Sequence, residues 1–196
     1  GYFVSHLECS ATGERYDAGQ LHGLSKTGRP LLVRYDLDRV RAATRRDALA
    51  GRAPDMWRYR ELLPLKEISS RVSLGESITP IQVPHATAKA LGTSSLFIKD
   101  EGRLPTGSFK ARGLAVAVSM ARQFGITRMA LPTAGNAGAA LAAYCSAAGM
   151  ESFIFCPDDA PETTISEIAY HGGTVFRVNG NITEIGPIVE NGKASA

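Results

Sequence analysis

The fold is decided by LFIKDEGRLPTGSFKARG at residues 96–113 and by TAGNAG at residues 133–138. In both places a short apolar run ends in small and polar residues, and a run of helix-forming residues begins directly afterwards. Ligands of α/β folds bind at turns that join a strand to a helix in this way. The sequence therefore predicts two ligand-binding loops in one α/β protein.

The same alternation continues towards the end of the chain. It predicts strands and helices in turn at residues 96–100, 109–124, 128–132, 136–148, 152–156, 161–171 and 174–178. Gly125, Gly149 and Gly172 follow the three helices, at the position where a left-handed residue commonly ends a helix. The pattern predicts the α/β class, with a parallel sheet that has helices on both faces.

Lys110 has an unusual position in the first of these helices. Ser108 is the predicted N-cap, so Lys110 and Arg112 lie in the first turn, where cations are disfavoured by about 0.3 to 1 kcal/mol. A lysine held at this positive helix end should lose its proton more readily, and the neutral amine is the form that attacks a carbonyl. From its position alone, Lys110 is as well interpreted as a solvated surface lysine as it is as a reactive one.

The TAGNAG loop opens a helix that is rich in small side chains. Small residues let the backbone approach a ligand, and the free N–H groups at such a helix start bind carboxylates. Gly138 costs up to about 1 kcal/mol relative to Ala inside a helix, which indicates close packing or a close ligand. Taken alone, this stretch favours an Ala-rich buried helix behind an ordinary turn, and only its pairing with Lys110 favours a ligand site.

Together, these stretches resemble the pyridoxal-phosphate enzymes of the tryptophan synthase β fold type, also called fold type II, and are most similar to the threonine synthase family. WRYRELLP at residues 57–64 and LGESITPI at residues 74–81 resemble segments that precede the lysine in that family. The resemblance covers residues 7–189. Several motifs in the right order are more specific than a single pattern.

The resemblance implies a set of site residues. It makes Lys110 the catalytic residue, which also binds pyridoxal 5′-phosphate covalently, and it places Asn136 at the ring hydroxyl and Phe109 in the cofactor site. It assigns the substrate, through its α-carboxylate, to the loop of Thr133, Ala134 and Gly135, with Ser108 as a further substrate contact. No metal ion is expected in this site.

The resemblance further implies the conversion of O-phospho-L-homoserine and water into L-threonine and phosphate, by a pyridoxal-phosphate-dependent lyase. Cysteate synthase, threonine dehydratase and diaminopropionate lyase share the lysine and asparagine loops, so these reactions stay open. A noncatalytic fragment or interaction module is the alternative from a different class of protein.

The same resemblance predicts four segments: an N-terminal extension at 1–53, part of the large cofactor domain at 54–105, a small mobile α/β domain at 106–186, and the start of the return to the large domain at 187–196.

The family's Gly-rich phosphate loop and its ligand to the pyridine nitrogen have no match in this sequence. We therefore expect the N-terminal half of the family sequence, inactive in isolation. Its expected partners are a phosphorylated amino acid and either a second copy or the C-terminal half.

The N-terminal segment resembles a zinc ribbon that has lost its ligands. CSATG at residues 9–13 and HGLS at residues 22–25 stand where relatives carry cysteine pairs. One cysteine with scattered histidines falls short of the four ligands of structural zinc, so we expect the strands without the metal. Cys145 and Cys156 fall in a predicted helix and strand, and three buried reduced thiols are expected.

Composition restricts the partners further. The 22 basic and 19 acidic residues give a net charge of only +3, which is too even to indicate nucleic-acid binding. No apolar run approaches the roughly 18 residues of a membrane helix, and the first residues lack a signal-peptide pattern. A cytoplasmic protein without nucleic-acid or membrane partners is the expectation.

Overall fold

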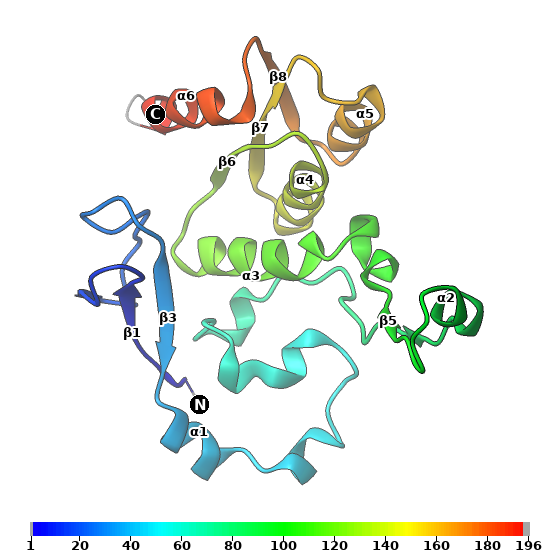
Figure 1. The fold of residues 1–196 in the computed structure, drawn as a ribbon. Coiled ribbons are helices and arrows are strands. Elements are labelled where there is room, and N and C mark those ends of the chain that lie inside the picture. Colours follow the sequence, from blue (N-terminus) through cyan, green and yellow to red (C-terminus); the bar gives the residue numbers. More distant parts are fainter. Residues whose placement is uncertain (1, 194–196) are drawn as a thin grey trace. The chain divides into compact units, whose positions relative to one another are not determined.

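The computed structural model describes the backbone of residues 2–193 and the side chains of residues 2–189 (Figure 1). The chain forms two compact units, each discontinuous in sequence. Unit 1 consists of the residues up to Arg71 and Ser119–Ile126, and unit 2 consists of Val72–Val118 and the residues from Thr127 onward. The segment boundaries expected after residues 53, 105 and 186 stay predictions.

Unit 2 contains the predicted parallel sheet. Its strands are β6 (Arg128–Pro132), β7 (Glu151–Pro157) and β8 (Thr174–Val178), in the order β6-β7-β8. They are linked by α4 (Asn136–Ala148) and α5 (Glu162–Tyr170), and α6 (Ile182–Lys193) follows β8. Both strand pairs are parallel, which confirms the predicted class.

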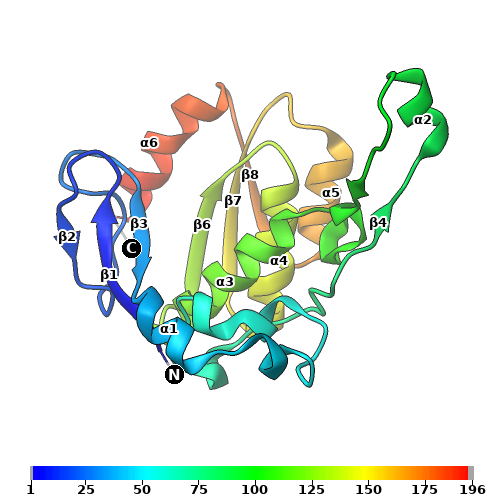
Figure 2. The same ribbon diagram turned by 60° about the horizontal axis from the view of Figure 1, so that its bottom comes forward.

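Helices cover both faces of this sheet, with α4 and α5 on one side and α6 on the other (Figure 2). On the first face the fully buried Ile154 of β7 lies against Gly138 of α4. The alternate residue Phe155 points to the opposite face and stacks on Phe176 of β8, with ring centroids 4.9 Å apart. Ile185 is buried on α6, which contacts β6 and β7.

The predicted close packing at Gly138 is confirmed. A Cβ atom built on this residue would lie 2.8 Å from Ile168 Cδ1 and 2.8 Å from Thr133 Cγ2. Only a residue without a side chain fits there, so α4 can approach both the sheet and α5. Each predicted helix-ending glycine, at positions 125, 149 and 172, has positive φ.

One predicted strand is wrong. Residues 96–100 were expected to belong to the parallel sheet, but only β5 (Ile98–Lys99) is a strand, and it pairs antiparallel with β4 (Ile81–Gln82). Parallel strands need both faces buried, whereas the Phe97 and Ile98 side chains are exposed. The Asp100 side chain also accepts a hydrogen bond from Gly102 N, which starts a 3₁₀ turn directly after the strand.

The remaining elements of unit 2 precede or begin the helix that carries Lys110. They are α2 (His85–Ala90), the 3₁₀ helices η4 (Glu101–Arg103) and η5 (Pro105–Gly107), and the first residues of α3 (Lys110–Gln123). The end of α3 belongs to unit 1. Among the described residues, no helix has the length and apolar character needed to cross a bilayer.

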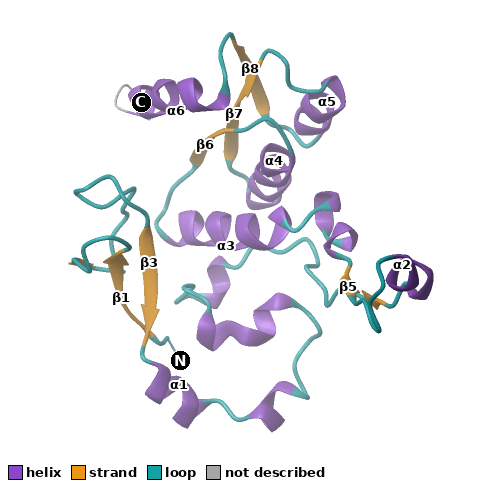
Figure 3. Ribbon diagram, in the orientation of Figure 1, coloured by secondary structure: helices purple, strands orange, loops and turns teal. Residues whose placement is uncertain are grey.

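Unit 1 contains a three-stranded antiparallel sheet and short helices (Figure 3). The strand order is β2-β1-β3, with β1 (Val4–Cys9), β2 (Arg15–Tyr16) and β3 (Leu31–Tyr35). The helical segments are α1 (Leu37–Ala43), η1 (Arg46–Leu49), η2 (Met56–Leu62) and η3 (Ile68–Ser70).

Two tight turns in this unit bring Cys9 next to hydroxyl groups. Cys9 Sγ donates a hydrogen bond to Ser25 Oγ at 3.2 Å and lies 3.6 Å from Thr27 Oγ1. The second turn lies at residues 25–28, where Gly28 has positive φ and its N–H bonds to Ser25 O. Hydrogen bonding, first with Ser25 and then with Thr12, lowers the pKa of the Cys9 thiol to about 6. All three cysteines are free and buried, as predicted.

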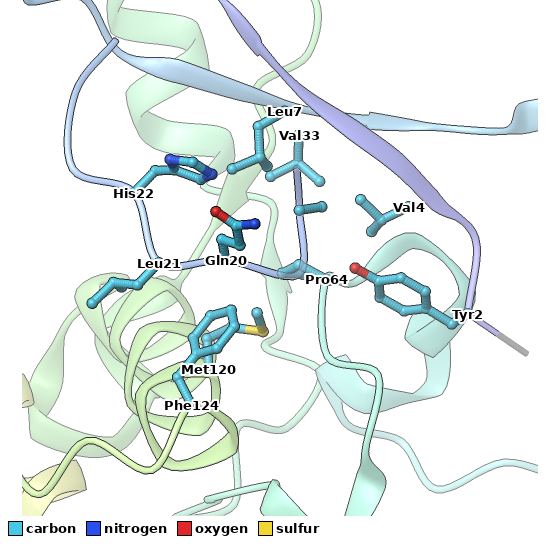
Figure 4. A pocket seen from close by; sticks show the side chains of 11 residues that line it. Tyr2, Val4, Leu7, Gln20, Leu21, His22, Val33, Pro64, Met120 and Phe124 are labelled. Carbon is cyan, nitrogen blue, oxygen red and sulfur yellow. The ribbon is translucent and has the colours of Figure 1, made fainter. Parts of the chain in front are cut away.

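A small apolar cavity of about 170 Å³ lies inside unit 1 (Figure 4). Val4, Leu7 and Val33 line it from the sheet, and Met120 and Phe124 line it from the end of α3 and the residue that follows. None of the residues that line this cavity belongs to the predicted active site.

Candidate active site

Every predicted site residue lies in unit 2, in two segments of that unit. Ser108, Phe109 and Lys110 are consecutive at the start of α3, directly after η5. The loop from Thr133 to Asn136 joins β6 to α4. Since η5 packs against α4, the segment that leads into the lysine lies beside the helix that begins with the asparagine.

The Lys110 amine lies 5.0 Å from the centre of the Phe109 ring. Within the described part of the chain, its Nζ forms neither an ion pair nor a hydrogen bond. The other cation of this first turn is different, because Arg112 pairs with Glu101 through contacts of 2.6 Å at Nε and 3.0 Å at Nη2. Lys110 therefore keeps a free amine at a helix start where its neighbouring cation is already neutralised.

The Glu101 carboxylate was not identified from the sequence. Hydrogen bonding to Arg112 is the main cause that lowers the pKa of Glu101, to about 2, with a further hydrogen bond from the Thr79 hydroxyl. The pair joins η4 to α3. A charged pair eleven positions apart, separated by a Pro-Thr-Gly turn, has no periodic signature in the sequence.

Ser108 does not act as the predicted side-chain N-cap. Its backbone oxygen accepts a hydrogen bond from Ala111 N, but its Oγ is buried and has no partner among the described residues. Ser108 has the extended backbone usual for a cap residue, and the chain reaches it through Thr106 and Gly107, which both have positive φ. The Ala111 N–H, which a capping hydroxyl would bind, is already bonded to the Ser108 backbone oxygen. Thr106 Oγ1 is buried without a partner as well.

These hydroxyl groups indicate where a ligand could contact the chain. A buried polar atom that makes no hydrogen bond costs roughly 1–3 kcal/mol, and a ligand group bonded to Ser108 or Thr106 would remove that cost. Thr106 is also the one described non-glycine residue with positive φ. Such strain is typical of functional sites. Both features lie within four residues of Lys110.

The second loop also has free donors. Thr133 is buried, and its Oγ1 accepts a hydrogen bond from Gly135 N at 3.1 Å. No side chain among the described residues caps the start of α4, so its first N–H groups are open to an anion. The side chain of Asn136 is exposed and makes no hydrogen bond within the described chain.

Ala134 opens into a pocket of about 520 Å³ at the carboxyl ends of the parallel strands. The pocket is completed by the residues that follow β7 and β8, among them Asp158, Asn179 and Asn181. Ligands of open α/β sheets bind at this edge. These polar residues were not predicted from the sequence, although they follow the strands predicted at 152–156 and 174–178 just as TAGN follows the strand at 128–132.

The two segments carry the kinds of chemical group that pyridoxal phosphate needs in its binding site. Lys110 offers an amine for its aldehyde, Asn136 an amide for its ring hydroxyl, and Phe109, which is 61% exposed, a flat surface for its ring. The unpartnered Ser108 hydroxyl and the open N–H groups of α4 suit the anionic groups of a substrate. The individual roles stay predictions.

Known proteins resemble the chain over most of its length. Threonine synthase of Methanocaldococcus jannaschii is 32% identical over 177 residues, which are 90% of this chain and 44% of that enzyme. Threonine synthase of Methanosarcina acetivorans is 32% identical over 183 residues, with 91% and 44% covered. The chain thus spans less than half the length of these relatives.

Solved structures share the fold. Diaminopropionate ammonia lyase from Escherichia coli superposes with a TM-score of 0.58 at 18% identity, over 63% of this chain and 36% of that chain. O-ureido-L-serine synthase gives a TM-score of 0.54 at 25% identity, over 60% and 38%. The family described as pyridoxal-phosphate dependent enzyme matches residues 72–194, which include both loops. The chain belongs to this family of pyridoxal-phosphate dependent enzymes.

Proposed function

We propose that this chain supplies the catalytic lysine of an enzyme that converts O-phospho-L-homoserine and water into L-threonine and phosphate. The observation that carries the proposal is the free Lys110 amine at the start of α3, beside two buried hydroxyls without partners. The two threonine synthases that align with at least 90% of the chain support this reaction within the family.

Each of the two loops has a part in binding. Lys110 Nζ would hold pyridoxal phosphate covalently, Asn136 would donate to its ring hydroxyl, and Phe109 would cover its ring. The bound cofactor supplies an electron sink for negative charge at the substrate Cα. The open N–H groups after Thr133, with Ala134 and Gly135, would bind the substrate α-carboxylate at the positive end of α4.

Proton transfer falls to the same lysine. Its amine, once it is free and neutral, would move protons between Cα and Cβ, while phosphate leaves Cγ and water adds at Cβ. Ser108 Oγ would contact the substrate, which gives its buried hydroxyl the partner that the chain does not provide. A phosphorylated amino acid is thus the proposed substrate. The proposed catalytic assembly contains either a second copy of the chain or the C-terminal half of the family fold.

Replacing the lysine tests the proposal. Lys110→Ala should remove the visible absorbance that develops when pyridoxal phosphate is added to the chain, and should abolish phosphate release from O-phosphohomoserine by the proposed catalytic assembly. Lys99→Ala is the control, because Lys99 binds Thr79 through contacts of 2.9 and 2.6 Å and has no proposed contact with the cofactor. If the Lys110→Ala variant develops the same visible absorbance with pyridoxal phosphate as the unchanged protein, the proposal is wrong.

The same assay separates the alternatives. Sulfite, added as a competing nucleophile, would be incorporated by a cysteate synthase and not by a threonine synthase. A noncatalytic interaction module would give no absorbance change with pyridoxal phosphate at all, even with Lys110 in place.

A further inference from the structure

A fully buried carboxylate lies between the two helices that carry Lys110 and Asn136. Glu76 has no exposed surface and belongs to the segment that links unit 1 to β4. Its carboxylate accepts hydrogen bonds from Ser73 Oγ and Leu74 N, both at 2.7 Å. A buried charge is tolerated only when donors surround it, so this segment is folded tightly around the Glu76 side chain.

On one side, Glu76 is bonded to α4. The Tyr144 hydroxyl donates to Glu76 Oε1, and the Tyr144 side chain is itself fully buried. Burial, and then the hydrogen bond to Glu76, raise the pKa of Tyr144, so its hydroxyl stays protonated and remains a donor. Tyr144 lies two helical turns after Asn136, on a helix whose first residue is that asparagine.

On the other side, the same segment is bonded to α3. Arg112 Nη2 donates to Ser77 O at 3.2 Å, while the rest of its guanidinium is held by Glu101. Arg112 lies two residues after Lys110, in the first turn of α3. Glu101 also accepts from the Thr79 hydroxyl, so the segment 73–79 is tied to α3 at more than one point.

We propose that Glu76 is a positioning residue, which fixes the start of α3 relative to α4 and so sets the spacing between Lys110 and Asn136. This inference rests on the proposed function, because that spacing matters only if the two residues act on one cofactor. A charge-assisted hydrogen bond between two fully buried side chains is strong and directional, which suits such a task.

Hydrogen exchange in the protein without cofactor tests the proposal directly. Tyr144→Phe removes the donor and keeps the ring, so amide exchange should accelerate about 10-fold or more in the peptides that contain the starts of α3 and α4. Exchange in β7 should change much less. Glu76→Gln should give the same pattern, and the double variant should be no worse than the worse single variant, because both changes break one contact.

Tyr16→Phe is the matched control, because Tyr16 also donates to a glutamate, Glu14 Oε2 at 2.8 Å, but in unit 1. It should leave exchange at both helix starts unchanged. In a titration with pyridoxal phosphate, Tyr144→Phe should lower the apparent affinity about 10-fold, and the control should not.

Two exchange results would overturn the positioning role: an unchanged rate at both helix starts, or an equal acceleration in β7, which would mean a general loss of stability. These outcomes are independent of the proposed function. If the unchanged protein forms no covalent bond between Lys110 and the cofactor, the proposed function fails, whereas the exchange comparison still decides whether Glu76 fixes the two helices.

Discussion

Ser108 differs from most buried serines because its hydroxyl has no partner among the described residues. Removing a hydroxyl that forms no hydrogen bond loses nothing in the folded state and avoids its desolvation penalty. Ser108→Ala should therefore leave the free energy of unfolding within about 0.5 kcal/mol or raise it, while it weakens substrate binding. Denaturant unfolding of the chain and the KM for phosphate release by the proposed catalytic assembly measure the two effects.

Ser25 offers the matching control for this prediction. Its Oγ is bonded to Cys9 and accepts from Arg29 N at 3.0 Å, so Ser25→Ala should cost about 1–3 kcal/mol. A comparable loss of stability in Ser108→Ala would contradict the view that its hydroxyl is reserved for a ligand.

Glu101 should make stability depend on pH. Its pKa falls from 4.5 to about 2 in the folded chain, chiefly through the hydrogen bond with Arg112. The unfolded chain then binds more protons, so this stabilisation is complete above pH 4.5 and is lost as the pH falls towards about 2. Glu101→Gln should flatten the pH dependence of the unfolding free energy over that range. Denaturant unfolding at a series of pH values measures it.

The exposed pair of Glu151 with Arg128 provides the comparison, with a contact of 2.8 Å and both side chains more than half exposed. Solvent screens such a pair, so Glu151→Gln should alter the pH profile little. If both variants give the profile of the unchanged protein, the Glu101 pair does not stabilise the fold.

At the scale of elements, the sequence predicted β6, α4 and β8 with the bounds that the structure gives them. The spacing of apolar residues and the glycines that end helices lie within or next to each of these elements. The local sequence is therefore sufficient to predict them. β5 could not be predicted in the same way, because its pairing with β4 depends on a partner strand some sixteen residues away. The Ser108 cap was predicted wrongly because residue type favours a cap, whereas in the structure the Ala111 N–H bonds to the Ser108 backbone oxygen instead of its hydroxyl.

Gly138 provides a test of the packing between α4, α5 and the sheet. Alanine has the higher helix propensity by about 1 kcal/mol, but its Cβ would lie 2.8 Å from Ile168 Cδ1. Overpacking should dominate, so Gly138→Ala should lower the free energy of unfolding by about 1–3 kcal/mol. Chemical denaturation provides the measurement.

Gly113 is the control inside α3, since a Cβ there would meet no atom within 4 Å. Gly113→Ala should stabilise the chain by up to about 1 kcal/mol. If Gly138→Ala and Gly113→Ala both stabilise the chain, α4 does not pack against the sheet as closely as described.

At the scale of the whole molecule, the residues of the candidate site were predictable from motifs, but the contacts that fix their positions were not. Tyr144 bonds to Glu76 and Arg112 bonds to Ser77 O, in each case across a long stretch of chain, and a single sequence contains no signal of these contacts. The division into two units is likewise a product of tertiary contacts, with α3 shared between them. The similarity to pyridoxal-phosphate dependent enzymes supports the proposed reaction, whereas the contacts in the structure indicate which residues hold Lys110 and Asn136 in place.

The central claim is that the Lys110 amine binds the aldehyde of pyridoxal phosphate. Borohydride reduction of the protein mixed with the cofactor, followed by peptide mapping with mass spectrometry, tests this claim most directly. We expect one pyridoxyl group, on Lys110 in the peptide that begins α3. A pyridoxyl group on another lysine, or none on Lys110 at saturating cofactor, would contradict it.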